Sequence, residues 1–254
     1  MSLGPGIKEV KNLLSQHWRD LWVAASDNYT KAVVRKSEKL KTVEAREKLI
    51  KDDLWWQEEL REELRSRKPP HMTKTDLVRL MEWKLARGKW RPLLKRLKAG
   101  NSEEDVVTIS TNAFHLADGN GEESIKEAVK EISKLVCVGP ATASAILSAY
   151  NPSKFAFMSD DPLEGIMGSR KYTLKMYLAY NKELQGHCNE LGISLDIGEK
   201  ALWTCATLGY TYATMNALNV AESSSSQPLS GERTIQKRRQ QTESEAHLKR
   251  QKKN

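Results

Sequence analysis

The sequence has no apolar run that approaches the ~18 residues needed for a membrane-spanning helix. Its first residues, MSLGPGIKEV, also lack the basic and then apolar layout of a secretory signal. These two absences predict a protein without a membrane segment. Hydrophobic residues make up 39% of the 254 positions and charged residues 29%, which is typical of a globular protein with a highly charged surface.

Cysteine is scarce, and its spacing is irregular. Cys137, Cys188 and Cys205 are odd in number and form no CxxC pair. Neither a disulfide framework nor a zinc site is therefore predicted. We expect three inert thiols in a reducing compartment and no metal ion.

Alternating β-branched runs are almost absent, whereas apolar residues recur at helical spacing, which predicts an all-α fold. A first amphipathic helix is expected to carry its apolar stripe from Ile7 to Ala25, and a second to span residues 27–40. A long charged helix follows Thr42. Because Lys68-Pro69-Pro70 ends this part, we expect an N-terminal helical layer over residues 1–70.

Capping residues mark the helices that follow. Thr73 or Thr75 can cap a helix that stops at Gly88, and Ser102 with its following acids marks the start of another. These helices belong to a second predicted region, residues 71–221.

The basic excess is concentrated in the C-terminal segment. Eight basic and four acidic residues lie between Ala221 and Asn254, a balance of +4 out of the formal +8 of the chain. The segment opens with SSSSQPLSGE and has few apolar residues, so we expect residues 222–254 to form a disordered basic tail. Two basic clusters in Lys237–Lys253 resemble a bipartite signal for a nuclear-import receptor and predict a nuclear protein. The alternative is a solvated tail that only adds solubility.

A second basic segment lies inside the predicted helical region. Seven basic residues and no acid occur from position 84 to position 98, with Trp83 and Trp90 interleaved: Lys84, Arg87, Lys89, Arg91, Lys95, Arg96 and Lys98. Cationic side chains beside aromatic faces suit a phosphate backbone with an exposed base. In the alternative interpretation, Leu93, Leu94 and Leu97 pack inward and the lysines form an ordinary solvated face. If this face is buried, the protein is better read as a helical interaction module without a nucleic-acid role.

The most informative stretch runs from Ile132 to Asp161. An amphipathic run ends at Leu135, the tight connection VCVGP follows, and a helix of small residues starts at once. Gly139 is expected to supply the backbone freedom of the turn, and Pro140 suits the first helical turn. The N–H groups at such a helix start form a ready anion site.

The pattern L-x-x-V-G-x-x-T-A-x-x-I from Leu135 to Ile146, followed by an Asp, resembles the helix-hairpin-helix DNA glycosylase superfamily. The stretch FMSDDPL is similar to the segment that carries the catalytic acid in 3-methyladenine-type members. The block Leu77–Leu94 also resembles a eukaryotic family that combines this block with the hairpin. The resemblance implies a glycosylase-like domain over residues 71–221 and DNA as the partner.

The resemblance also assigns roles to individual residues. It implies that the hairpin grips a DNA phosphate and that Asp161, next to Asp160, supports the departure of a base. It implies DNA binding by the hairpin residues Val138, Gly139, Ala141 and Thr142. The charge of the basic segment adds Lys84, Arg87, Lys89, Arg91 and Lys95 as candidate DNA-binding residues.

Three departures from the superfamily pattern limit the expected chemistry. Cys137 replaces the first glycine of the hairpin, which compromises the phosphate grip if that position needs a positive φ. Ala141 replaces the lysine of lyase-competent members, which excludes a Schiff base through this position. Three cysteines cannot ligate a four-cysteine iron–sulfur cluster. An enzyme of this class would be monofunctional and free of cofactors.

Two alternatives stay open at the sequence level. Ser159 and Asp160 also fit a plain capping role for a helix with Pro162 at its first position. The whole domain could also be a non-catalytic scaffold that binds DNA or protein partners in the nucleus, which Cys137 and Ala141 favour.

Overall fold

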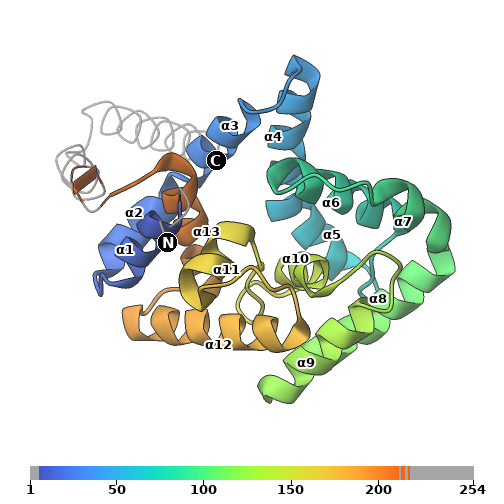
Figure 1. The fold of residues 1–254 in the computed structure, drawn as a ribbon. Coiled ribbons are helices and arrows are strands. Elements are labelled where there is room, and N and C mark those ends of the chain that lie inside the picture. The colour runs from blue at the N-terminus through green and yellow to red at the C-terminus, as the bar shows by residue number, and fades with distance from the viewer. Residues whose placement is uncertain (1–5, 212, 215–216, 218–254) are drawn as a thin grey trace, which may run out of the picture. The chain divides into compact units, whose positions relative to one another are not determined.

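The computed structural model describes residues 6–211, 213–214 and 217, and the predicted basic tail with its import clusters lies outside these residues. Within the described part every regular element is a helix, and the all-α prediction is confirmed (Figure 1). No helix there is long and apolar enough to span a bilayer. The helices are α1 (Ile7–Leu14), α2 (Arg19–Asp27), α3 (Tyr29–Ser37), α4 (Val43–Gln57), α5 (Glu59–Ser66), α6 (Lys74–Arg87), α7 (Leu94–Gly100), α8 (Glu103–Asp118), α9 (Gly121–Ile132), α10 (Pro140–Tyr150), α11 (Asp160–Met167), α12 (Leu174–Leu191) and α13 (Leu195–Leu208).

Two of the predicted helices are each interrupted. The first amphipathic stretch forms α1 and α2, so the prediction of one helix was wrong. The turn between them has its own hydrogen bonds, from Ser15 Oγ to the carbonyl of Asn12 (2.8 Å) and from Trp22 Nε1 to the carbonyl of Gln16 (3.1 Å). The side chain of Ser15 thus competes with the helical backbone pattern. The long charged helix is likewise divided, at Glu58, into α4 and α5.

Thr73 and Ser102 cap their helices as predicted. The side-chain oxygen of Thr73 accepts a hydrogen bond from the backbone N–H of Asp76 (3.1 Å), and that of Ser102 accepts one from Asp105 (3.0 Å). In both cases the aspartate carboxylate accepts a hydrogen bond from the backbone N–H of the capping residue (2.9 and 3.3 Å), so two orphan donors are satisfied at each helix start. These caps fix where α6 and α8 begin.

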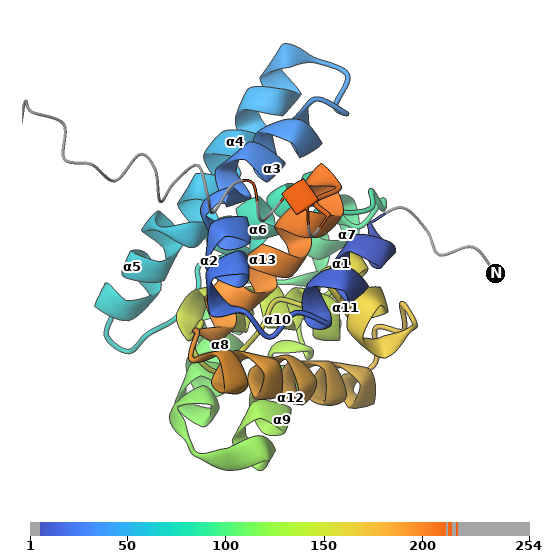
Figure 2. The same cartoon turned by 90° about the vertical axis from the view of Figure 1, so that its left-hand side faces the viewer.

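The last helix, α13, is packed among the first helices of the chain. It contacts α1, α2 and α3, and it also contacts α11 and α12. In two perpendicular views the N-terminal helices lie beside α13 (Figures 1 and 2). On the opposite side of the unit, α4 packs on α6, and α5 and α6 both contact α10. The N-terminal helices therefore reach both α10, which follows the expected hairpin, and α11, which begins with the expected acids.

Helices on both sides of residue 70 share one hydrophobic core. Trp56 of α4 stacks on Trp83 of α6 with 4.4 Å between ring centroids, and Phe157 lies 5.8 and 5.6 Å from these two rings. Trp56 Nε1 also donates to the carbonyl of Ala145 on α10 (3.0 Å). A smaller cluster of Tyr29, Ala32, Val33 and Trp203 joins α3 to α13.

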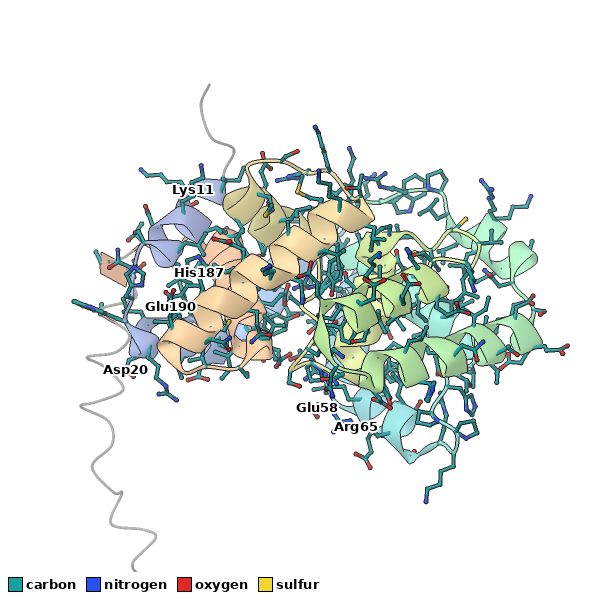
Figure 3. The ribbon with its side chains drawn as sticks, turned by 90° about the horizontal axis from the view of Figure 1, so that it is seen from below. Lys11, Asp20, Glu58, Arg65, His187 and Glu190 are labelled. Carbon is teal, nitrogen blue, oxygen red and sulfur yellow. The ribbon has the colours of Figure 1, made fainter. Side chains whose placement is uncertain are left out.

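The outer helix α12 contacts the turn between α1 and α2. His17 Nδ1 lies 3.9 Å from Glu190 Oε2, and the rings of Trp22 and His187 are 6.5 Å apart. Figure 3 shows His187 and Glu190 on α12, on the side where Lys11 of α1 and Asp20 of α2 are also labelled. The pair of His17 and Glu190 lies at the surface, whereas the ring of Trp22 is buried.

Candidate functional site: a cationic cavity at the start of α10 and α11

The connection between α9 and α10 is a hairpin held by a side chain from outside the motif. Asn101, which follows α7, donates from Nδ2 to the carbonyl of Val136 (3.1 Å) and accepts from its N–H at Oδ1 (2.8 Å). Nδ2 also donates to the carbonyl of Leu97 (2.9 Å). Asn101 therefore fixes the hairpin to the end of the basic segment. Sequence reasoning missed this residue because a buried Asn between two helices looks like an ordinary loop residue.

The left-handed position in this hairpin is Cys137, with φ of 66°. Such a conformation costs an L-residue with a Cβ atom roughly 1–2 kcal/mol. The hairpin thus has the positive φ in spite of the missing glycine. Gly139 has φ of −102° and ψ of −179°, so the expectation that it supplies the unusual backbone freedom was wrong. It lies in extended backbone as the N-cap of α10.

Helix α11 begins at the two candidate acids. Ser159 is its N-cap residue but makes no capping hydrogen bond, because its hydroxyl donates to Glu199 Oε1 on α13 (2.8 Å). Asp160 and Asp161 occupy the first two helical positions, and Pro162 the third. Ser159 thus occupies the N-cap position that the capping alternative gives it, but its side chain does not cap the helix, and Pro162 is the third helical residue and not the first.

Arg170 connects the two acids. Its Nη2 donates to Asp161 Oδ1 (2.8 Å), its Nη1 lies 3.9 Å from Asp160 Oδ2, and it also pairs with Glu164. The hydroxyl of Tyr172 donates to Asp160 Oδ1 (2.8 Å). Partial burial raises the pKa of Asp161, and the positive charge of Arg170 opposes this shift. Asp161 is thus a half-buried carboxyl whose ionisation depends on a neighbouring cation.

A cavity of about 500 Å³ brings most of the predicted site residues together. Its lining includes Asp160 and Asp161, the hairpin residues Gly139, Ala141 and Thr142, and the basic residues Lys84, Arg87, Lys89 and Arg91. Two predicted residues are absent from its lining. Val138 is buried, and its N–H is used in the turn, donating to the carbonyl of Leu135 (3.1 Å). Lys95 is exposed elsewhere on the surface.

Arg87 lines the cavity but is almost completely buried, with only 3% of its surface exposed. Its guanidinium carbon lies 3.8 Å from the ring centroid of Trp203 and 4.9 Å from that of Phe157. Nε lies 3.9 Å from Asp53 Oδ1, and Nη2 lies 3.7 Å from Glu199 Oε1. Burial raises the pKa of both carboxyls, and the charge of Arg87 opposes both shifts. A contact between this guanidinium and a phosphate at the outer surface is therefore not available in this conformation.

The basic segment is partly a core element and partly an open face. Trp83 is fully buried, so the expectation that it is interleaved with an exposed cationic face was wrong. Leu97 is buried as well, in line with the alternative interpretation. Trp90, by contrast, is 70% exposed, and its neighbours Lys89 and Arg91 are exposed with it.

Several residues of the cavity were not predicted from the sequence. Lys36 comes from α3, Arg170 and Tyr172 from the segment between α11 and α12, and Trp203 from α13. Each belongs to an element remote from the hairpin in the chain. No local motif surrounds any of them, so only the packing of the helices could identify them.

No family model, curated protein or solved structure matches this chain. Within the described residues, no group of three or more His, Cys, Asp or Glu side chains has an arrangement that could hold a metal ion. The groups that the cavity offers are carboxylates, cations and the start of α10.

Proposed function

We propose that the protein binds DNA and acts as a monofunctional DNA glycosylase, which hydrolyses the N-glycosidic bond of a nucleotide placed in the cavity. The observation that carries this proposal is the convergence of three features on one cavity: the start of α10, the acids at the start of α11 and an excess of basic side chains. The start of α10 and the acids belong to one sequence motif. The basic side chains come from other parts of the chain and line the same cavity.

The hairpin and the basic segment would hold the DNA backbone. At the start of α10, Pro140 has no N–H and the N–H of Thr142 donates to the carbonyl of Gly139 (2.8 Å). The N–H of Ala141 is the one left to bind an anion at this positive end of the helix dipole. Lys89 and Arg91 add positive charge beside the start of α10. The exposed Trp90 ring between them offers a face on which an unpaired base can stack.

Asp161 is the candidate for the chemical step. When a base departs with the bonding electrons, the sugar develops oxocarbenium character, which an ionised carboxylate stabilises while water adds to the sugar carbon. Burial of Asp161 would strengthen this interaction, and Arg170 favours the ionised form that it needs. Ala141 offers no amine at the hairpin, so the proposed reaction is hydrolysis without a covalent intermediate at that position.

A second candidate function is a non-catalytic scaffold that keeps the DNA-binding surface. The observation that favours it is the ion pair between Arg170 and both candidate acids. An acid that is already paired has to be uncovered before it can face a sugar. This scaffold would show the same DNA binding without base release.

Duplexes that contain alkylated, deaminated or oxidised bases test the two candidates. We expect wild-type protein to release at least one base, and Asp161→Asn to release it on the order of 10²-fold more slowly with little change in duplex affinity, because only the transition state carries the sugar's charge. Asp160→Asn is the matched control and should lose much less, since its amide oxygen can still accept from Tyr172. Duplex binding without release of any base supports the scaffold, and absence of duplex binding contradicts both functions.

A further inference from the structure

The positive charge in the cavity is only partly compensated. Six cationic and two acidic side chains line it. Arg170 is paired with the two acids, and Arg87 lies between Asp53 and Glu199. The cations that remain are Lys36, Lys84, Lys89 and Arg91.

Lys36 and Lys84 are the informative pair because they are both partly buried and unpaired. Among the described residues, neither amine has a carboxylate within 4 Å or a hydrogen-bond partner. Some other lysines are paired, such as Lys48 and Lys98, whose Nζ atoms each lie 3.3 Å from a carboxylate oxygen of Glu82. Two partly buried amines that line the same cavity, neither paired with a carboxylate at close range, form a built site for an anion.

The surroundings of the two amines also disfavour their positive charges. Burial lowers the pKa of Lys84, and the positive charges of Arg91 and Arg87 lower it further, while Asp160 opposes the shift. Burial likewise lowers the pKa of Lys36, assisted by Lys39 and Arg87 and opposed by Asp161 and Asp160. An anion bound between the amines would replace lost solvation and reduce the repulsion among these cations.

We infer that Lys36 and Lys84 form a subsite for a phosphate monoester, and that the preferred DNA therefore presents a terminal phosphate at a strand end, a nick or a gap. This inference rests on the proposed DNA binding and adds a substrate class to it. A phosphate monoester carries up to two negative charges above its second pKa of about 6, whereas a diester within a strand carries one. The dianion thus gains more from two unpaired amines than an internal phosphate does.

The shape of the site favours the same ligand. An internal phosphate is bonded to a nucleotide on each side, so the DNA chain has to leave the cavity in two directions. A terminal phosphate is bonded to only one nucleotide, so the chain leaves in one direction. A cavity of about 500 Å³ holds roughly one nucleotide, so a single connection fits it better. A free nucleoside monophosphate has the same chemistry, and the experiment has to separate the two sources.

The test is competition binding of the full-length protein to duplexes with a one-nucleotide gap. The gap ends carry either phosphate or hydroxyl, on the 5′ and the 3′ side in separate arms. We expect at least one phosphorylated end to bind about tenfold more tightly than its hydroxyl counterpart, as one charge-assisted contact would give. A free deoxynucleoside monophosphate should compete more weakly than the phosphorylated duplex because it lacks the contacts to the DNA backbone.

Three variants identify the residues involved. Lys84→Gln and Lys36→Gln should each abolish most of the preference for phosphorylated ends, while Lys95→Gln, on the exposed surface outside the cavity, should weaken both duplexes alike. Equal binding of phosphate and hydroxyl ends overturns the subsite but leaves the proposed DNA binding intact. Stronger competition by the free nucleotide overturns the assignment to a strand end. Loss of all duplex binding in the wild type contradicts the proposed function itself.

Discussion

At Cys137 the backbone has φ of 66°, in a region that glycine enters without cost and other residues rarely do. Hydrogen bonds of the two neighbouring residues keep the backbone in this strained conformation. Its neighbour Val136 is fixed by both of its backbone groups to Asn101, and the next residue, Val138, donates to Leu135. The side chain of Cys137 also lines the cavity. A conformation that costs free energy beside a candidate site is therefore enforced by contacts on both sides of the residue.

Replacing Cys137 tests this strain. We expect Cys137→Gly to have a larger free energy of unfolding than Cys137→Ala by about 1 kcal/mol, because only the variant with a Cβ atom keeps the left-handed penalty. Both variants remove the sulfur, so the comparison isolates the backbone. Urea denaturation monitored by tryptophan fluorescence measures the difference. Greater stability of the alanine variant would show that the hairpin relaxes away from positive φ.

The identity of the site residues was more predictable than their environment. The start of α10 was predicted from a local pattern, because a tight turn followed by small residues constrains the backbone over a few positions. The pair Asp160–Asp161 was predicted from the resemblance of FMSDDPL to a glycosylase segment; both acids line the cavity, and their role stays a prediction. The burial of Arg87 was not predicted, because an arginine within a run of basic residues is expected to face solvent. Its cage of Trp203 and Phe157 comes from segments 70 or more positions away in the chain.

At the scale of elements, α11 is held in place by very close packing against α1. A Cβ atom built on Gly165 of α11 would lie 2.1 Å from Cγ1 of Val10, a distance at which one helix has to move. Because α11 starts with Asp160 and Asp161, its position decides where these acids lie in the cavity. The N-terminal helix thus braces the site without lining it.

Gly165→Ala should therefore destabilise the protein by roughly 1–3 kcal/mol, the usual cost of overpacking a core. Val10→Ala in the same chain should recover part of this loss, because it removes the methyl groups that the new Cβ meets. The non-additivity of the two changes, measured in a double-mutant cycle by thermal or urea unfolding, is the decisive quantity. Additive effects would contradict the close contact between α1 and α11.

Helix starts were predicted better than helix breaks. Thr73 and Ser102 carry a reciprocal pattern with the third residue of the helix, which is a local signal. The turn between α1 and α2 has no Gly or Pro, and its apolar spacing continues through Trp18, which is nevertheless 55% exposed. Such breaks depend on how α1 and α2 pack against α11 and α13, and periodicity along one helix does not contain that information.

At the scale of the whole molecule, a buried polar network ties the N-terminal helices to the cavity. Asp53 on α4 accepts hydrogen bonds from Tyr29 of α3 (3.1 Å) and Trp83 of α6 (2.8 Å). Arg87 connects this carboxylate to Glu199 on α13, which in turn accepts from Ser159 at the start of α11. Helices α3 and α4 are therefore part of the support of the site. The sequence shows which helix faces are apolar, but it does not show which faces meet.

Arg87 lies within 4 Å of two buried carboxylates, so its removal should be costly in a pH-dependent way. We expect Arg87→Met to lower the free energy of unfolding by about 3–5 kcal/mol near neutral pH, as when one partner of a buried ion pair is lost. Arg79→Met is the matched control. Its partner Asp52 keeps Lys48 at 2.6 Å, so a much smaller loss is expected.

The pH dependence follows from the carboxyls that remain. Burial already holds the pKa of Asp53 and of Glu199 above their usual values, and Arg87 opposes both shifts, so the variant raises both pKa values further. A carboxyl whose pKa is raised by folding favours the folded state below its unfolded pKa of about 4, and this contribution is lost as the pH rises through the folded pKa. Urea unfolding should therefore show a larger deficit for Arg87→Met at pH 8 than at pH 5. An equal deficit at both values would mean that Asp53 and Glu199 gain other partners when Arg87 is absent.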